Sequence, residues 1–114
     1  MRELTVGQNL TAGSSNTVYT VPKGCKAIAT LLMLSNYGGS SKSLTAEWYD
    51  HSDASSVVIV GGHSVGAGSY LMFNQGRMVM DEYDELRVTP EASSSFSVIF
   101  TVEILQNTAY QNGS

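Results

Sequence analysis

Formal charge is the first thing that this sequence has little of. Only 14% of its 114 residues are Asp, Glu, Lys or Arg, against about 25% in a typical soluble domain. The six basic residues are spread thinly along the chain, and the formal net charge is -4. Proteins that bind nucleic acid gather Lys and Arg into patches that follow the phosphates. We therefore expect no nucleic-acid partner.

Cysteine and long apolar runs are also scarce. Cys25 is the one cysteine of the sequence, which excludes an internal disulfide and any cysteine-rich zinc site. No stretch approaches the roughly 18 consecutive apolar residues of a membrane helix. Residues 1–10 also lack the basic start and apolar run of a signal peptide. These absences predict a soluble protein that is made in the cytoplasm and has no membrane partner.

Small residues take the place of the missing charges. Gly, Ser and Thr are abundant, and 42% of the residues are hydrophobic, which is enough for a packed core. This balance favours many short strands joined by small-residue turns. We expect one domain over residues 1–114, with an N-terminal strand and polar loop over residues 1–16 and a polar tail over residues 107–114.

The clearest strand lies near the C-terminus, from Ser95 to Gln106. Its apolar residues alternate with others and would share one face: Phe96, Val98, Phe100, Val102 and Ile104. The opposite face would be mixed: Ser97, Ile99, Thr101, Glu103 and Leu105. A period of two with one wholly apolar face predicts a strand that packs on a second sheet.

Further strands are predicted at residues 3–6, 17–21, 26–34, 43–50, 56–60, 70–73, 77–80 and 86–89. Their spacing, and the lack of an amphipathic helix, predict an all-β fold: an antiparallel β-sandwich, jelly-roll-like, with about eight strands. The nearly continuous apolar segment 26–34 is expected to be an inner or interface strand covered on both faces. The glycines at 61, 62, 66 and 68 are expected to interrupt the strand that starts at residue 56, as bulges or a sharp bend. The spacing does not fix the strand order.

Two sets of residues are candidates for burial and contact. The predicted core or interface residues are Ile28, Leu32, Leu34, Trp48, Phe96 and Phe100. Trp48 belongs to this set because it shares a strand face with Leu44 and Ala46. The predicted contact surface consists of partly exposed tyrosines, namely Tyr37, Tyr49 and Tyr83.

One short motif suggests catalysis. Residues 62–66, GHSVG, match the G-x-S-x-G pattern that presents a nucleophilic serine on a strand-to-helix turn. A helix would have to follow Ser64, and an acid and then a histidine would have to lie downstream. Here a glycine-rich strand pattern follows, and His51 and His63 lie before or within the motif. We predict a glycine bend with no catalytic residue, and a protein that is not an enzyme.

Carboxylates cluster at residues 81–85, DEYDE. Several carboxylates together suit calcium, but their spacing matches no known calcium loop. A solvated acidic turn that blocks edge pairing is the simpler interpretation. His51, beside Asp50 and Asp53, is an equally weak metal candidate. We expect no metal and no cofactor.

Two segments carry a resemblance to a known group of proteins. In NTVYTVPKGCKAIATLLMLSN (16–36), a short strand ends in Val-Pro-x-Gly and a long apolar strand closes on Asn; MVMDEYDELRVT (78–89) joins an apolar pair, an acidic turn and a strand. With the alternating last strand, the chain resembles the small β-sandwich virion proteins of tailed bacteriophages over about residues 16–106. Many of those proteins have Ala-Gly-Asp at the acidic turn, where this chain has DEYDE.

The resemblance implies a structural role without catalytic residues. Our leading hypothesis is a capsid decoration or cement protein, located in the virion and made in the host cytoplasm. Its partners would be the major capsid protein or other virion proteins, and it would form a homo-oligomer, a trimer or a dimer. One alternative is a tail, neck or fibre-attachment subunit. Another is a carbohydrate-binding module that uses Trp48 and the exposed tyrosines, Tyr49 among them, as stacking surfaces.

Overall fold

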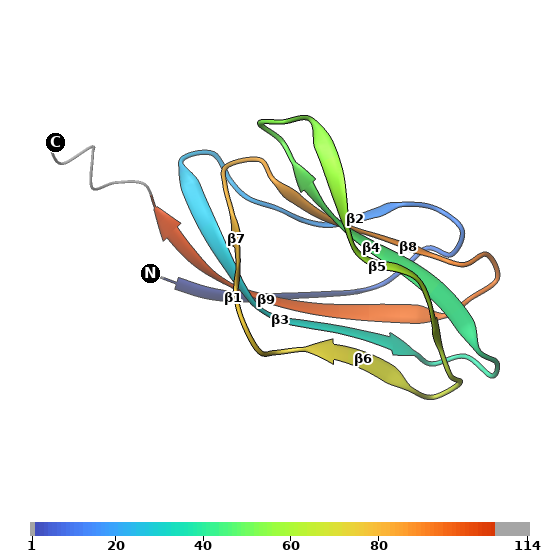
Figure 1. Cartoon of the computed structure of the whole chain (residues 1–114). Helices are drawn as coiled ribbons and strands as arrows, with labels where there is room; N and C mark the ends of the chain where they lie inside the picture. The colour runs from blue at the N-terminus through green and yellow to red at the C-terminus, as the bar shows by residue number, and fades with distance from the viewer. Residues whose placement is uncertain (1, 107–114) are drawn as a thin grey trace, which may run out of the picture.

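The computed structural model describes residues 2–106, which form nine strands in two antiparallel sheets (Figure 1). The strands are β1 (Arg2–Asn9), β2 (Asn16–Thr20), β3 (Cys25–Asn36), β4 (Lys42–Asp50), β5 (Ser55–Val65), β6 (Tyr70–Phe73), β7 (Met78–Met80), β8 (Glu85–Pro90) and β9 (Phe96–Gln106). β6 and β7 both pair with β3, β6 with residues 32–35 and β7 with residues 27–29, so they share one strand position. The predicted sandwich of about eight strands is confirmed.

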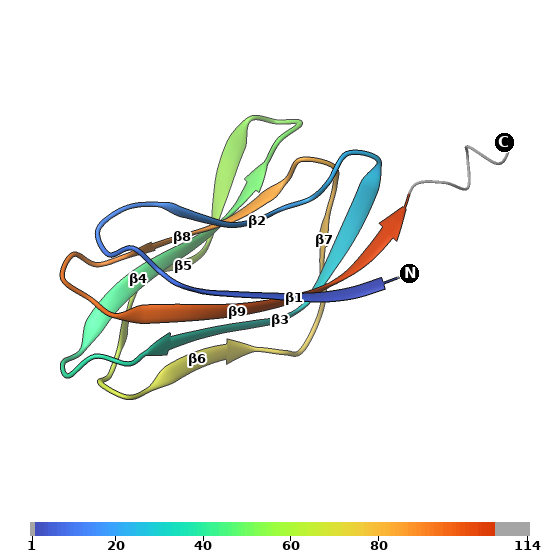
Figure 2. The same ribbon diagram turned by 180° about the vertical axis from the view of Figure 1, so that it is seen from behind.

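The strand order identifies the sandwich as a jelly roll. One sheet has the order β1-β9-β3-β6, with β7 also on β3, and the other has the order β2-β8-β4-β5. Every neighbouring pair except β4-β5 joins strands that are distant in the sequence, as two interlocked Greek keys require. Seen from behind, β1, β9, β3 and β6 form one layer, with the second sheet across from it (Figure 2).

The core lies between the two sheets and is centred on β9. The five residues predicted to share its apolar face are buried, with at most 5% of each exposed, while alternate residues on the other face are half-buried or exposed. β9 pairs with β1 on one side and with β3 on the other along nearly its whole length. The prediction from its two-residue period is confirmed, because a central strand must cover the core with one face.

Two strands are longer than the sequence predicted. β1 continues to Asn9 because it pairs with β9 as far as the Asn9–Ser97 partners, and the residue after it, Leu10, is buried. The expectation of a surface loop from residue 7 was therefore wrong at its start. β5 runs through Gly61 and Gly62 to Val65, so the glycines do not end the strand. Gly61 and Gly62 coincide with an irregularity in the pairing of β5 with β4, which agrees with the expected bulge, and Gly62 has a φ of 55°.

The apolar strand β3 is an inner strand, as predicted, between β9 and the β6–β7 position. The expectation that both of its faces are covered was only partly right. Leu32 and Leu34 are buried between the sheets, whereas Leu31 and Met33, which point the other way, are half-buried. The predicted polar tail, residues 107–114, lies outside the described residues. Within residues 2–106 there is no helix of the length and apolarity needed to cross a membrane.

Candidate functional site

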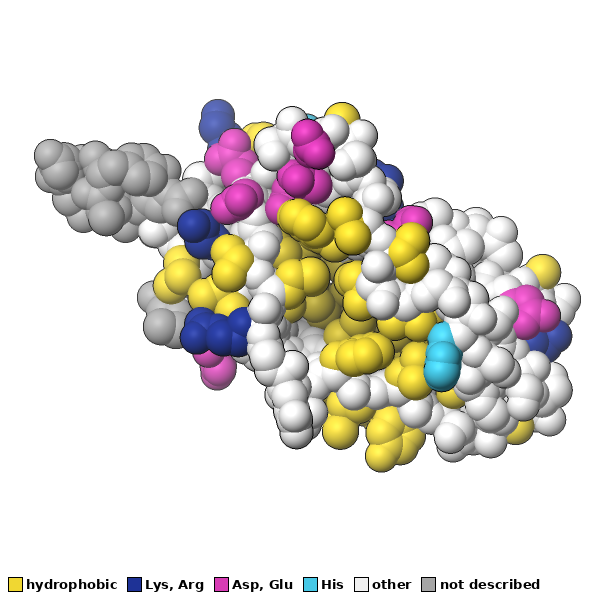
Figure 3. Space-filling view, in the orientation of Figure 1, with side chains coloured by type: hydrophobic (Ala, Val, Ile, Leu, Met, Phe, Trp, Pro, Cys, Tyr) yellow, Lys and Arg dark blue, Asp and Glu magenta, His cyan; other side chains and the backbone are white. Residues whose placement is uncertain are grey.

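The main surface feature of the molecule is an open side of the sandwich. β5 is the last strand of one sheet, and β6 and β7 occupy the last position of the other. A hollow of about 200 Å³ separates them, and apolar side chains gather in it (Figure 3). This volume is below the roughly 300 Å³ at which small-molecule pockets begin. The hollow suits inserted side chains better than a free organic ligand.

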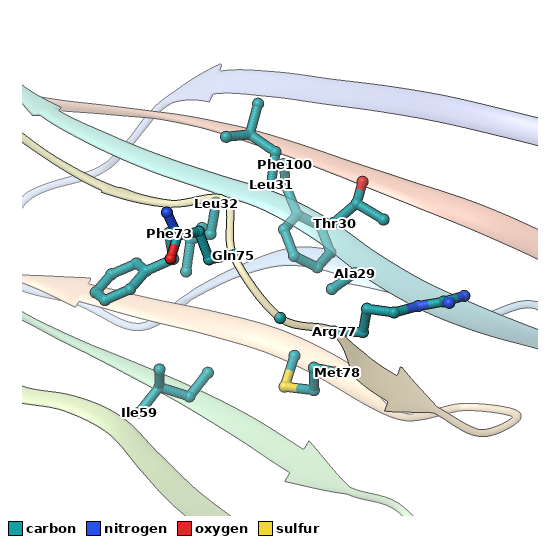
Figure 4. A pocket seen from close by; sticks show the side chains of 11 residues that line it. Ala29, Thr30, Leu31, Leu32, Ile59, Phe73, Gln75, Arg77, Met78 and Phe100 are labelled. Atoms are coloured by element: carbon teal, nitrogen blue, oxygen red, sulfur yellow. The ribbon is translucent and has the colours of Figure 1, made fainter.

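Apolar residues of β3, β5, β6, β7 and β9 line most of the hollow (Figure 4). Leu32 of β3 and Phe100 of β9 belong to the buried core and are reached through the opening. Phe73 and Met78 stand on one side, and Ile59 of β5 stands on the other. Of these, Ile59 and Phe73 remain 38% and 43% exposed. Core apolar surface is thus continuous with exposed apolar surface across this side.

A break between β6 and β7 opens the hollow. The connecting residues Asn74–Arg77 leave the sheet, and Gly76 adopts a φ of 90° that favours glycine. No residue of β6 or β7 pairs with Thr30 or Leu31 of β3. Residues 74–76, between the predicted strands 70–73 and 77–80, therefore interrupt one strand position instead of joining two neighbouring strands.

Exposed apolar side chains are concentrated on the same side. Among residues 2–106, six of the ten exposed large hydrophobic residues lie between residues 57 and 73: Val57, Val58, Ile59, Tyr70, Met72 and Phe73. The sequence from residue 54 to residue 76 contains no Asp, Glu, Lys or Arg. Arg77, directly after this run, is the one charged residue that lines the hollow. We call the surface made by β5, β6 and the hollow between them the neutral edge.

β5 is the part of the neutral edge that sequence reasoning missed. Residues 26–34 were expected to be an inner or interface strand, and they are an inner strand, whereas β5 has β4 on one side and no described strand on the other. Val57 and Val58 point to opposite faces and are 51% and 55% exposed. The signal available in the sequence was the long charge-free run. Edge strands that stay in solvent usually carry charge or proline, so an edge strand without either indicates a contact surface.

The predicted core and interface residues lie mostly inside. Leu34, Phe96 and Phe100 are at most 1% exposed, and Leu32 and Ile28 are 6% and 9% exposed. Ile28 lies on the outer face of β3, opposite Val79 of β7. Trp48 is half-buried against the core. Of this set, only Leu32 and Phe100 line the hollow of the neutral edge.

Two of the three predicted contact tyrosines come together. The ring of His51 lies 6.4 Å from that of Tyr49 and 5.2 Å from that of Tyr83, both edge-on. The guanidinium carbon of Arg87 is 3.9 Å from the centre of the Tyr49 ring, so a cation already covers one face of it. Tyr37 is 58% exposed and follows β3, in a different part of the chain. These residues do not form one open stacking platform.

The acidic segment is a structural turn whose carboxylates are engaged separately. Asp84 is buried, and its carboxylate accepts hydrogen bonds from Trp48 Nε1 at 3.1 Å and from the backbone N–H groups of His51 and Asp81 at 2.9 Å each. The other carboxylates contact different groups: Glu82 accepts the Gly24 N–H, Glu85 pairs with Arg87, and Asp81 lies 3.9 Å from Lys26. Among residues 2–106, no three His, Cys, Asp or Glu side chains gather as a metal site.

The GHSVG motif lies inside β5. Ser64 is exposed, and its residue pairs with Ser43 of β4. A turn and then β6 follow the motif, where a nucleophile elbow would have a helix. His63 is likewise a strand residue, opposite Leu44. The motif therefore lacks the local geometry that gives the pattern its chemistry.

Within the described part of the chain, two side chains have a shifted pKa. Burial raises the pKa of Tyr19, with a smaller contribution from Cys25 that is partly offset by Arg2. The Tyr19 hydroxyl is buried and has no hydrogen-bond partner among the described residues. The backbone N–H of Ser43, which donates to the Glu91 carboxylate at 2.9 Å, lowers the pKa of that group, helped by the charge of Lys42. Neither group lies on the neutral edge.

Comparison with known proteins supports the fold class alone. No family model and no curated protein matches the sequence. Solved structures do match: a chain from Bacillus endospore appendages, which form disulfide-linked pili, has a TM-score of 0.57 at 14% identity, over 92% of this chain and 87% of that one. A chain of the infectious bursal disease virus particle has a TM-score of 0.58 at 11% identity, over 96% of this chain. The match spans only 32% of the viral chain. This protein shares a jelly-roll fold with subunits of both assemblies.

Proposed function

We propose that this protein is a non-catalytic structural subunit that works by burying its surface against neighbouring protein subunits. The neutral edge is the observation that carries the proposal. A stable monomer rarely leaves a large contiguous apolar patch in water. Here an unpaired strand, a hollow open to the core and six exposed apolar side chains all belong to β5, β6 or the space between them. Residues 54–76 carry no charge, and Arg77 is the one charged residue that lines the hollow.

Within that class, we assign the protein to the virion of a tailed bacteriophage, as a capsid decoration or cement protein. The strand and turn pattern of residues 16–106 supports this assignment, as does the jelly-roll fold that it shares with a virus-particle chain. A decoration subunit would bind the major capsid protein at several symmetric positions. It would stabilise the shell because a ligand that binds only the assembled form shifts the equilibrium toward it.

A fibre subunit is the second candidate. The match to the endospore-appendage chain covers 87% of that chain, which means that nearly the whole appendage subunit is comparable with this protein. The match to the viral chain covers only 32% of a larger chain. In this alternative the protein would assemble end to end, as part of a phage tail, neck or fibre attachment or of another protein fibre. Repeated head-to-tail contacts generate filaments, while closed contacts generate rings and shells.

The test of the cement role uses phage particles from which this gene has been deleted. Purified protein added to such particles is expected to bind at many symmetric sites and to raise the melting temperature of the shell. Absence of binding to shells that are otherwise intact would reject the cement role. Electron microscopy of complete particles then separates the two candidates, since a decoration protein covers the capsid faces and a fibre subunit lies at one vertex or along the tail.

The carbohydrate-binding alternative predicts a different result. A glycan array probed with the purified protein would give signals that disappear with Tyr49→Ala and persist with Tyr37→Ala. Tyr37 is the control because it is exposed and lies apart from the ring contacts of His51 with Tyr49 and Tyr83. A blank array favours the assembly role. The Arg87 guanidinium over the Tyr49 ring already speaks against free stacking there.

A further inference from the structure

We propose that the neutral edge is where two copies of this chain meet, with β5 of one copy pairing antiparallel with β5 of the other around a two-fold axis. The proposal rests on the structural-subunit function above and names the partner and the surface. Its first basis is the backbone. An edge strand exposes unpaired N–H and C=O groups, and another extended strand satisfies them best.

Charge identifies the partner strand. The docking strand must be apolar and uncharged, because a charge placed against Val57, Val58 or Ile59 would lose its hydration without gaining a partner. The chain has a formal net charge of -4, and all of its charged residues lie outside residues 54–76. Among residues 2–106, β5 and β6 are both exposed, uncharged edge strands, and β5 is the longer of the two, with 11 residues against 4. A second copy is therefore complementary to the first without any like-charge contact.

The bulges of β5 limit the pairing to its first half. The register against β4 is regular from Ser55 to Val58 and shifts at Ile59 and again around Gly61 and Gly62. The stretch Ser55–Ile59, which is regular up to Val58 and ends at the first irregularity, is then the segment that pairs with its own copy, centred on Val57. Such bulges commonly protect edges from indefinite pairing. Here they restrict the contact to one closed, isologous pair.

The two faces of β5 would be buried differently. On the inner face, Val57 would meet its symmetry mate and extend the apolar layer that includes Ile59 and the hollow. On the outer face, Val58 would lie beside Ser56 of the other copy. The four-stranded sheet that contains β5 would then continue across the axis into the same sheet of the other copy, which gives one sheet of eight strands, four from each copy.

The test measures the oligomeric state of the full-length protein by sedimentation equilibrium across a concentration series. Wild type is expected to be a dimer at micromolar concentration. Val58→Lys places two lysines close together across the axis and is expected to weaken the dimer about 100-fold. Val79→Lys is the matched control, since Val79 is 50% exposed on β7, away from β5, and should leave the dimer unchanged. Circular dichroism checks that both variants fold.

Hydrogen exchange supplies a readout that needs no variant. Backbone amides of residues 55–59 should be protected at high protein concentration and exchange faster on dilution. The amides of β1, which is an edge strand of the other sheet, should not change. A wild-type protein that stays monomeric, a dimer that Val58→Lys leaves intact, or a dimer that Val79→Lys weakens equally would each overturn the proposal. If the protein is monomeric, the dimer proposal is wrong, and the cement role is still tested separately by shell binding. If the protein is a dimer that does not bind the shell, the cement role is rejected and the dimer proposal stands.

Discussion

The indole N–H of Trp48 donates a 3.1 Å hydrogen bond to Oδ2 of Asp84, which is 1% exposed. The same carboxylate accepts the backbone N–H groups of His51 and Asp81. One buried side chain thus ties the turn before β8 to β4 and to the start of the β4–β5 turn. The acidic segment holds strands together here, and only part of it is a solvated face.

Asp84→Ala is expected to lower the free energy of unfolding by about 3 kcal/mol, because three buried or half-buried donors lose their acceptor. For a domain of this size the melting temperature would fall by about 10 °C. Asp81→Ala is the control, since the Asp81 side chain is 73% exposed and contacts Lys26 only at 3.9 Å. Equal losses for both variants, measured by urea unfolding, would contradict a special role for Asp84.

Phe100→Ala should be among the most destabilising substitutions in β9. Phe100 is 1% exposed, and its ring centre lies 6.0 Å from that of Tyr19. Removing a buried phenyl ring costs about 3–5 kcal/mol. Ile99 is the preceding residue, lies on the outer face of β9 and is 41% exposed in the wild type. Ile99→Ala should therefore lower the free energy of unfolding by about 1 kcal/mol or less. Similar costs at the two positions would show that the faces of β9 are assigned wrongly.

Tyr19→Phe should be neutral or slightly stabilising at pH 7, because it removes a buried hydroxyl that has no partner among the described residues. The pKa of Tyr19 is raised on folding, so the unfolded chain ionises first as pH rises. The wild type should therefore lose stability as pH rises from about 10 upward. Urea unfolding from pH 8 to 11 should show a smaller decline for Tyr19→Phe. Parallel declines would contradict this account.

Glu91→Gln tests the lowered pKa of a surface carboxyl. Because folding lowers the pKa of Glu91, its stabilising contribution is present above the unfolded value of about 4.3 and is lost as pH falls through the folded pKa. The stability difference between wild type and Glu91→Gln should therefore be larger at pH 6 than at pH 3. Glu3→Gln, on the exposed part of β1, serves as the control. A difference that is independent of pH would exclude the carboxylate as its source.

Local pattern alone was enough to predict the all-β class, the sandwich and the two faces of β9, since side chains alternate in any strand and apolar ones must be buried. Element ends were predicted less well. β1 extends past residue 6 because β9 pairs with it, and β5 passes through Gly61 and Gly62 because β4 holds it in register despite two bulges. Such pairings involve residues that are far apart in sequence, so no local window contains them.

The sequence by itself determined which residues are apolar, where alternation is strict, and that residues 54–76 carry no charge. Only the tertiary structure decided what those features do. Long-range pairing placed β3 inside a sheet and β5 at an edge, turned Asp84 inward, and left Thr30 and Leu31 without a partner from β6 or β7. An apolar residue is core or contact surface according to the neighbours that the fold gives it, and strand order, which sets those neighbours, is a property of the whole chain.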